Sequence, residues 1–518
     1  MNENPPKPSR RSLGYKILIG LACLGLLIFF AVLVLDLVAK HSLNRYERKW
    51  EAKGEHFDFA SFVPPPVPDD QNFALTPIVA SSYGRVLDKN GHKLEPQQTN
   101  IIDRLKMPIR DAESQWETST NSGNWAKGIK TNLKGWQLYY RTLAAKTNEF
   151  PVPPQPQTPA ADVLLALSKY DAAIAELRQA AALPDSRFPL NYDSKFPAEI
   201  LLPHLAGLKS CSQMLQLRAV AELQNGQSDR ALADVKLILR MTDSIRTEPL
   251  MISQLVRIAM LNFALQPVWE GLQDHQWSDA QLAELNQELA KLDFLADCEF
   301  SMRSERANSL ADIEYLRRSR DVNLLFASEE PTPEYAKVAF HLIPNSVFYQ
   351  NELAIARAHQ EWFLPVVAVA QHNVSPTKVR LAENKIEKLG LHWSPNTLLA
   401  RMLLPAPAAY AKKCACGQNL VDMARVACAL ERCRVAEGSY PETLDVLAPR
   451  FIAALPHDVI GGQPLKYHRT DEGRFALYSV GWNGVDDGGA VVLKKDSKTF
   501  IDYEKGDWVW TGQVLVTE

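Results

Sequence analysis

The segment LRAVAELQNGQSDRALADVKLILRM, residues 217–241, carries the helical pattern from which the fold class follows. Its small and apolar residues return at three- and four-residue spacing on both sides of the sequence NG, as they do in helices that bury one face. The segment therefore predicts a helical hairpin, in which two helices pack against each other across a short turn.

The same segment resembles part of a tetratricopeptide repeat. Five residues stand where that repeat keeps small or apolar side chains, namely Ala219, Gly226, Ala231, Val235 and Ile238. Only one match of this kind occurs, and the neighbour expected one repeat length further on is missing. Two interpretations stay open, an irregular helical bundle or solenoid with one matching hairpin and a true repeat array, and we expect the first.

Helix-start signals extend this pattern over residues 158–400, which we interpret as one large helical domain. Thr158 is a predicted N-cap with Pro159 at the first helical position. The sequence SDAQ from Ser278 matches a capping box, and a further helix is predicted after Ser375. The chain is therefore expected to be mainly α.

A membrane helix is predicted near the N-terminus. Residues 17–35, ILIGLACLGLLIFFAVLVL, contain no charge, and at about 1.5 Å per residue they span roughly 28 Å, the thickness of a bilayer core. We expect an uncleaved transmembrane helix over residues 17–39, with a cleavable signal peptide as the alternative. Residues 1–16 would be a cytoplasmic tail, and the C-terminal body would be exported from the inner (cytoplasmic) membrane.

Residues 40–157 are expected to be a linker and a mixed region. A charged run after the apolar segment can prolong the helix, and Pro64, Pro65, Pro66 and Pro68 would end it and space the body from the bilayer. Trp116, Trp125 and Trp136 follow without a sustained period. The sequence predicts little else there.

Composition excludes some functions and leaves others open. With 518 residues, two or three domains are expected, and 57 basic against 60 acidic residues give a net charge of -3. No basic stripe is present, so nucleic acid is not an expected partner. The seven cysteines lack zinc-finger spacing and are predicted mostly to be buried thiols. We find no phosphate loop, G-x-S-x-G elbow or H-E-x-x-H pair.

A small α+β domain with an antiparallel sheet is predicted over residues 401–518. The helical stretch NLVDMARVACALERCRVAEG ends near Gly438, and PLKYHR and FALYSV are predicted strands joined by the turn TDEG. Such a hairpin can pack on the preceding helix. We expect the domain to pack as a distinct unit.

The C-terminal region resembles that of the major pseudopilin of type II secretion systems, the protein G family. The resemblance covers about a fifth of the chain and rests on the order of short motifs: G-x-YP, LP-x-D, G-x-P-x-x-Y, Y-x-L-x-S-x-G-x-x-G and D-W. The matching residues are Gly438, Tyr440, Pro441, Leu455, Pro456, Asp458, Gly462, Pro464, Tyr467, Phe475, Leu477, Tyr478, Ser479, Gly481, Gly484, Asp507 and Trp508. Ile19 stands where a prepilin has glutamate, so prepilin processing is not expected.

The resemblance implies a calcium site in the glycine-rich acidic loop YSVGWNGVDDGG, residues 478–489. The ligands implied are Asp486, Asp487 and Asp507, with Asn483 and backbone carbonyls as further candidates. The alternative from the residues themselves is a pair of tight glycine turns, since the spacing is not that of an EF-hand and lysines lie nearby.

These observations predict a membrane-anchored envelope protein with protein partners and an interaction or scaffolding role, associated through the resemblance with pseudopilin-like assemblies. One alternative is a helical module that binds peptides or proteins and has no link to secretion. Another is an envelope hydrolase whose active site is assembled from dispersed residues.

Overall fold

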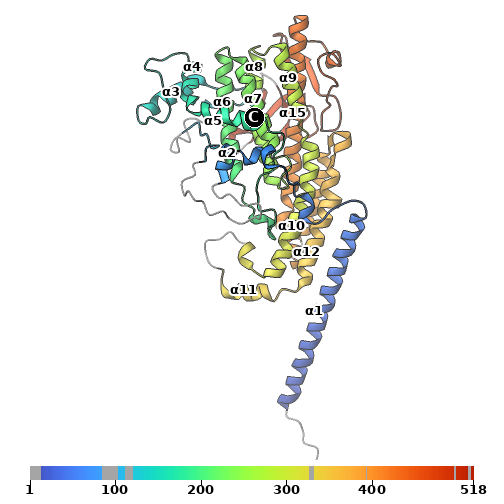
Figure 1. Ribbon diagram of the computed structural model, residues 1–518. Coiled ribbons are helices and arrows are strands. Elements are labelled where there is room, and N and C mark those ends of the chain that lie inside the picture. The colour runs from blue at the N-terminus through green and yellow to red at the C-terminus, as the bar shows by residue number, and fades with distance from the viewer. Residues whose placement is uncertain are drawn as a thin grey trace, which may run out of the picture.

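The computed structural model describes residues 13–83, 103–110, 121–325, 332–391, 394–494, 497–510 and 515–517. The predicted tail up to residue 12 and Trp116 lie outside these residues. Helix makes up 65% of the structure, as the sequence predicts, and small sheets lie near the C-terminus. Figure 1 shows an elongated helical body from which one long helix projects.

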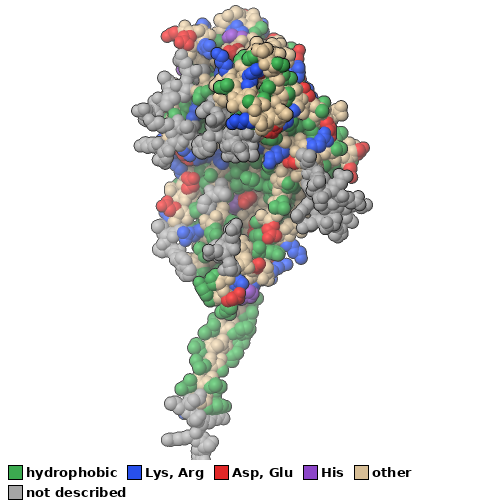
Figure 2. Space-filling model, turned by 90° about the vertical axis from the view of Figure 1, so that its left-hand side faces the viewer, with side chains coloured by type: hydrophobic (Ala, Val, Ile, Leu, Met, Phe, Trp, Pro, Cys, Tyr) green, Lys and Arg blue, Asp and Glu red, His purple; other side chains and the backbone are tan. Residues whose placement is uncertain are grey.

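The projecting helix, α1 (Leu13–Glu51), has two differently placed halves. Its side chains from Tyr15 to Val38 are almost all exposed, and Figure 2 shows this part covered with hydrophobic side chains. From Ala39 onward, α1 buries Leu43 and Tyr46 against the body. The charged run does prolong the helix. The apolar window of this helix of 37 residues, Tyr15–Glu51, is 0% buried, as in membrane anchors and signal sequences.

The body consists of helices joined mostly by short turns. Their bounds are α2 Pro77–Ala80, α3 Leu133–Ala144, α4 Pro159–Leu167, α5 Asp171–Ala181, α6 Pro203–Gln224, α7 Ser228–Ser244, α8 Met251–Gln273, α9 Asp279–Leu289, α10 Phe294–Ser319, α11 Glu334–His341, α12 Asn345–Ala358, α13 Pro376–Leu391, α14 Leu398–Leu403 and α15 Pro405–Glu437. The predicted hairpin is the α6–α7 pair. Helix α8 is also apolar and long enough to span a membrane, but 61% of its apolar window is buried inside the body.

The predicted helix starts are confirmed. Thr158 Oγ1 accepts a hydrogen bond from the N–H of Ala161 at the start of α4. At α9, Ser278 and Gln281 form the complete capping box, with each side chain accepting from the other residue's N–H. Helix α13 begins directly after Ser375.

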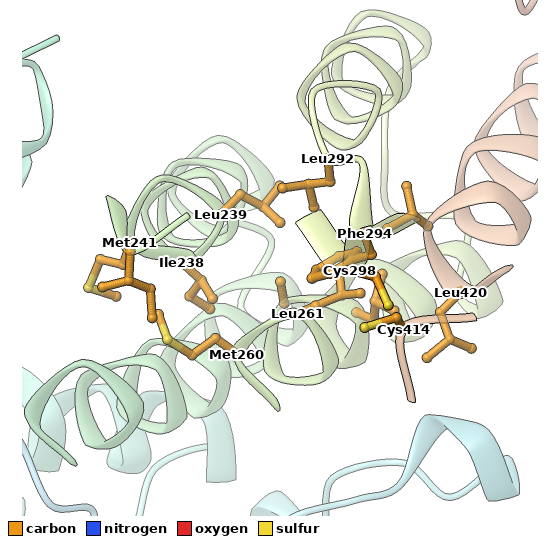
Figure 3. Close-up of a cluster of buried hydrophobic side chains, with 14 of the residues drawn as sticks. Ile238, Leu239, Met241, Met260, Leu261, Leu292, Phe294, Cys298, Cys414 and Leu420 are labelled. Atoms are coloured by element: carbon orange, nitrogen blue, oxygen red, sulfur yellow. The ribbon is translucent and has the colours of Figure 1, made fainter. Parts of the chain in front are cut away.

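The core of the body runs between α7, α8, α10 and α15, and Figure 3 shows part of it. Met241 and Met260 lie at one end of this cluster, and Cys298 and Cys414 point toward each other between α10 and α15 at the other. All seven cysteines are free thiols; five of them are buried, which confirms the predicted role of most.

Two small sheets follow α15. Strands β3 (Lys466–Arg469), β4 (Phe475–Ser479) and β7 (Trp508–Val509) form an antiparallel sheet, in which β3 and β4 are the predicted hairpin. In the other sheet, β5 (Ala490–Lys494) pairs antiparallel with β6 (Ser497–Gly506) and parallel with β8 (Leu515–Thr517). A short pair, β1 (Val367–Ala368) and β2 (Asn373–Val374), precedes α13.

The C-terminal elements share the core of the helical body. Helix α15 packs against α8, α9 and α10, and one cluster of buried hydrophobic residues includes side chains from both regions. Strand β4 pairs with β3 and β7, which also belong to residues 401–518. The strands are thus local, whereas the packing is continuous across residue 401, and the domain division stays a prediction.

The segment after α1 differs from the spacer that its prolines predict. Helix α1 ends at Glu51, before the prolines, and Gly54 turns the chain with a φ of 88°. Phe57 and Phe62 are then buried, and the ring of Phe62 meets that of Phe300 on α10 edge to face. Because these aromatic side chains bury apolar area, the segment is held on the body and does not separate it from α1.

Candidate binding cleft

A cleft of about 770 Å³ opens between helices α6 and α8. Two segments before α4, residues 106–110 and 122–136, form its rim, and strand β6 contributes Tyr503. The lining residues are Lys106, Pro108, Ile109, Arg110, Ser122, Gly123, Asn124, Trp125, Ala126, Thr131, Trp136, Glu149, Ser210, Gln213, Gln216, Leu217, Asn262, Phe263, Gln266 and Tyr503. The cleft is therefore built from parts of the chain that are up to about 400 residues apart.

Helix α8 holds the rim through two buried polar side chains. The Gln266 side chain accepts from the N–H of Trp125 at 2.7 Å and donates to Ile129 O at 3.2 Å. One turn further along α8, Glu270 accepts from both the N–H and the hydroxyl of Thr131, at 2.9 and 2.7 Å. Burial raises the pKa of Glu270, and these hydrogen bonds oppose the rise. The rim is thus fixed relative to α8.

Gly123 allows the rim to approach α8 this closely. Its φ is 72°, and a Cβ at this position would lie 2.6 Å from Gln266 Nε2 and 2.9 Å from the backbone nitrogen of Thr131. Both the conformation and the contact exclude a larger side chain. A glycine is therefore required where the rim crosses the helix.

Two tryptophans lie beneath the polar surface of the cleft. Trp136 is fully buried and donates from Nε1 to Asn121 O at 3.1 Å. The guanidinium of Arg110 lies 5.6 Å from its ring centroid, within range of a cation–π interaction, and donates to Ser122 Oγ at 3.1 Å. Burial lowers the pKa of Arg110. The ring of Trp136 thus helps to position a cation at the cleft surface.

Amide side chains give the cleft its remaining polar character. Gln213 is exposed on α6, Gln216 donates to Ser122 O at 3.3 Å, and Asn262 donates to Ile258 O at 2.8 Å. Each amide carries both donors and an acceptor, which matches the alternating N–H and C=O groups of an extended peptide. Lys106 and Arg110 add positive charge, whereas Glu149 lies 3.5 Å from Lys169. The chemistry suits an extended segment with acidic side chains.

The three predicted calcium ligands lie around the acidic loop. Asp507 accepts from the N–H groups of Gly489, at 2.6 Å, and Asp487, at 3.3 Å. Asp486 lies 3.0 Å from Lys466 Nζ and also accepts from the hydroxyl of Tyr478. The structure thus brings Asp507 to the loop, but the carboxylates pair with protein donors.

No group of three or more His, Cys, Asp or Glu side chains is placed to hold a metal ion among the described residues. Burial raises the pKa of Asp507 to about 6, and the neighbouring carboxylates Asp486 and Asp487 add to the rise. Gly484, Gly488 and Gly489 all have positive φ, as tight turns require. Calcium binding by the loop stays a prediction.

Asp458 and Ser479, which belong to the resembling motifs, join strand β4 to helix α15. Asp458 Oδ1 accepts from Asn419 Nδ2 at 3.0 Å and from Ser479 Oγ at 2.9 Å, and its Oδ2 accepts from the N–H of Val480 at 2.9 Å. All three side chains are buried. Since a buried carboxylate needs such donors, these motif residues have a structural role.

A serine, a glutamate and a histidine also meet inside the body, away from the cleft. Glu248 accepts from Ser253 Oγ at 2.5 Å and lies 2.8 Å from His204 Nε2. The carboxylate stands between the hydroxyl and the imidazole, whereas activation of a nucleophile needs the imidazole between the other two. This buried chain is arranged for packing and hydrogen bonding.

Comparison with known protein families, curated proteins and solved structures found no match for this chain. The cleft was not predicted from the sequence. Trp125, Trp136 and Gly123 were the available signal, but nothing in their spacing connects them with α6, α8 or Tyr503. The cleft therefore has to be interpreted from its own chemistry.

Proposed function

We propose that the chain is a single-pass protein of the cytoplasmic membrane whose exported body has an interaction or scaffolding role in the cell envelope. One observation carries the proposal: α1 is exposed and apolar over one half and buried in the body over the other. A signal peptidase cut after Ala39 would leave Leu43 and Tyr46 on the body but would divide α1 and remove Asp36, which accepts hydrogen bonds from α12. An anchor that stays attached explains both halves.

The interaction is assigned to the cleft between α6 and α8. Its rim is held by Gln266 and Glu270, so the site is already formed before a partner binds. The exposed amide of Gln213 and the cations Lys106 and Arg110 suit an extended, acidic segment of another envelope protein. The body would hold that partner close to the membrane.

A link to pseudopilin-like assemblies is the more specific part of the proposal. It is supported by the order of the C-terminal motifs, which run from Gly438 to Trp508. The hairpin β3–β4 packed on α15 is an arrangement of the kind that those motifs imply. A peptide-binding role without a link to secretion is the alternative, and the identity of the partner distinguishes the two.

Photo-crosslinking from the cleft tests the proposed interaction. A photoreactive amino acid replaces Gln213 in the cleft of the full-length protein in its native membrane. Gln287, an exposed glutamine on α9 that does not line the cleft, receives the same replacement as the matched control. We expect a crosslinked envelope protein from position 213 and none from position 287, with the crosslinked segment identified by mass spectrometry.

The outcome is decided by where the crosslink maps. A segment rich in acidic residues supports the proposal, and a pseudopilin or another secretion component as its source supports the specific assignment. Crosslinks of equal yield from both positions, or none from position 213 in any growth condition, would contradict binding in the cleft.

A further inference from the structure

Helix α11 presents an apolar stripe that no other described part of the body covers. Tyr335 and Val338 on α11 and Leu342, the residue directly after it, are 78%, 59% and 77% exposed. They follow one another at three- and four-residue spacing, so their side chains lie on one face of the helix. Contiguous exposed apolar side chains mark an interaction surface.

The opposite side of α11 is fixed to the body. Phe340 is buried, and its ring meets that of Phe348 on α12 edge to face at 5.9 Å. Arg320 donates to Ile343 O at 2.7 Å and so holds the turn between the two helices. The stripe is therefore presented by an ordered helix.

The position of α11 relative to α1 indicates what the stripe contacts. Asp36 directly follows the uncharged run that ends at Leu35 and lies in the last turn of the predicted span, which runs to residue 39. Its Oδ1 accepts from the N–H of Ser346 at 2.6 Å, and its Oδ2 accepts from Asn345 Nδ2 at 3.2 Å. The first turn of α12, and α11 just before it, thus lie level with the edge of the bilayer core.

The figures agree with this placement. Figure 1 shows α11 at the lower end of the body, on the side from which α1 projects. Figure 2 shows hydrophobic side chains at that lower end, close to the exposed part of α1. A bilayer crossed by α1 would therefore meet the lower end of the body where α11 lies.

We infer that α11 is a second membrane contact, which lies in the interfacial region of the bilayer that α1 spans. Tyrosine is enriched at this depth because its ring is apolar and its hydroxyl stays hydrated. Glu334 and Lys337 pair at 2.7 Å, which lowers the cost of bringing their charges to the interface. Two contacts fix the tilt of the body on the membrane, which one helix alone would leave free.

The inference rests on the anchor of the proposed function, and its test separates the two. The full-length protein with Cys23→Ser is reconstituted into vesicles of phosphatidylcholine and phosphatidylglycerol. A nitroxide spin label is attached to one new cysteine at a time, in Val338→Cys, Leu342→Cys, Leu27→Cys and Leu138→Cys. The other native cysteines are buried or partly buried, and labelling of the Cys23→Ser protein gives the background.

Collision of each label with oxygen and with a water-soluble nickel chelate measures its immersion. Leu27 lies in the middle of α1, and Leu138 is exposed on α3, far from the projecting helix in Figure 1. We expect labels at positions 338, 342 and 27 to lose collisions with the chelate and keep those with oxygen. The label at position 138 should collide freely with the chelate.

Each other result overturns a defined part of the account. If position 27 is immersed but positions 338 and 342 resemble position 138, α11 does not touch the bilayer. Labels at 338 and 342 that are shielded from both agents show a second copy of the chain on the stripe in place of lipid. If position 27 itself collides with the chelate, the anchor of the proposed function fails.

Discussion

The indole rings of Trp125 and Trp510 lie 5.2 Å apart at a tilt of 40°, and this contact joins the rim of the cleft to the C-terminal strands. Trp510 directly follows β7, and its backbone N–H donates to the backbone oxygen of Leu477 in β4. Both rings are buried, with exposed fractions of 4% and 1%. This aromatic pair is thus one of the contacts that connect the cleft with the C-terminal region.

Replacing both tryptophans should destabilise the protein by less than the sum of the two single replacements. Trp125→Ala and Trp510→Ala should each lower the free energy of unfolding by about 3–5 kcal/mol, because each leaves a large cavity. The double variant should cost about 0.5–1.5 kcal/mol less than the sum, since the mutual contact is lost only once. Denaturant unfolding in detergent micelles measures both quantities. Trp50→Ala, on α1, where the Trp50 ring packs against Tyr46, combined with Trp510→Ala should be additive.

Asp36 should stabilise the attachment of α1 to α12. Asp36→Ala removes the acceptor for the N–H of Ser346 and should lower the free energy of unfolding by about 0.5–2 kcal/mol, the usual cost of a lost N-cap. Asp36→Asn keeps an oxygen acceptor and should lose much less. Thermal unfolding of the two variants side by side measures the difference, and equal losses would contradict a capping role.

Glu352 should make stability depend on pH above neutrality. Burial, with Glu314 and Glu47 nearby, raises the pKa of Glu352 to about 9. Protonated Glu352 therefore stabilises the folded state. This contribution is fully present below the pKa of the unfolded chain, near 4.5, and is lost as the pH rises through the folded-state pKa of about 9. Unfolding free energies measured from pH 5 to 9 should fall with pH.

Glu352→Gln is the variant that isolates this effect. The amide cannot ionise. The free energy of unfolding of the variant should therefore change less with pH above pH 7, and the variant should be more stable than the natural protein at pH 8. Glu47, whose pKa is raised to about 7, contributes mainly at lower pH and is separated in this way. Parallel pH profiles for the variant and the natural protein would contradict the assignment.

Asp507 should hold the acidic loop whether or not calcium is bound. Asp507→Ala leaves the N–H groups of Gly489 and Asp487 without this acceptor and should cost about 1–3 kcal/mol, with chelator present. The calcium prediction adds a rise of the melting temperature at millimolar calcium, which Asp486→Asn with Asp487→Asn should abolish. If calcium does not change the melting temperature, the loop is a pair of hydrogen-bonded turns and does not bind calcium.

The elements that follow from local chemistry were predictable. The capping box at Ser278, the N-cap at Thr158 and the glycine that ends α15 at position 438 depend on residues within four positions of one another. The hairpin β3–β4 follows in the same way from alternation and the turn sequence TDEG. Such signals need no knowledge of the rest of the chain.

The elements that depend on distant partners were not predictable. The prolines at positions 64–68 indicate a stiff spacer, but Phe57 and Phe62 beside them find apolar partners in the body. The cleft combines Gln213 and Gln266 with Trp125 and Tyr503. The spacing of these residues in the sequence does not predict that they lie close together. In the acidic loop, the carboxylate of Asp486 contacts Lys466 and Tyr478, which lie near it only because strands β3 and β4 have folded.

The export of the body can be measured by the side of the membrane on which the C-terminus lies. Reporters fused after Glu518 of the full-length chain distinguish the two sides, since alkaline phosphatase is active only after export and a cytoplasmic fluorescent protein only without it. We expect active phosphatase in the membrane fraction, attached to a chain that retains α1 at its full length. A fluorescent fusion with inactive phosphatase, or an active phosphatase on a chain cleaved within α1 after the apolar run, would contradict an anchored and exported body.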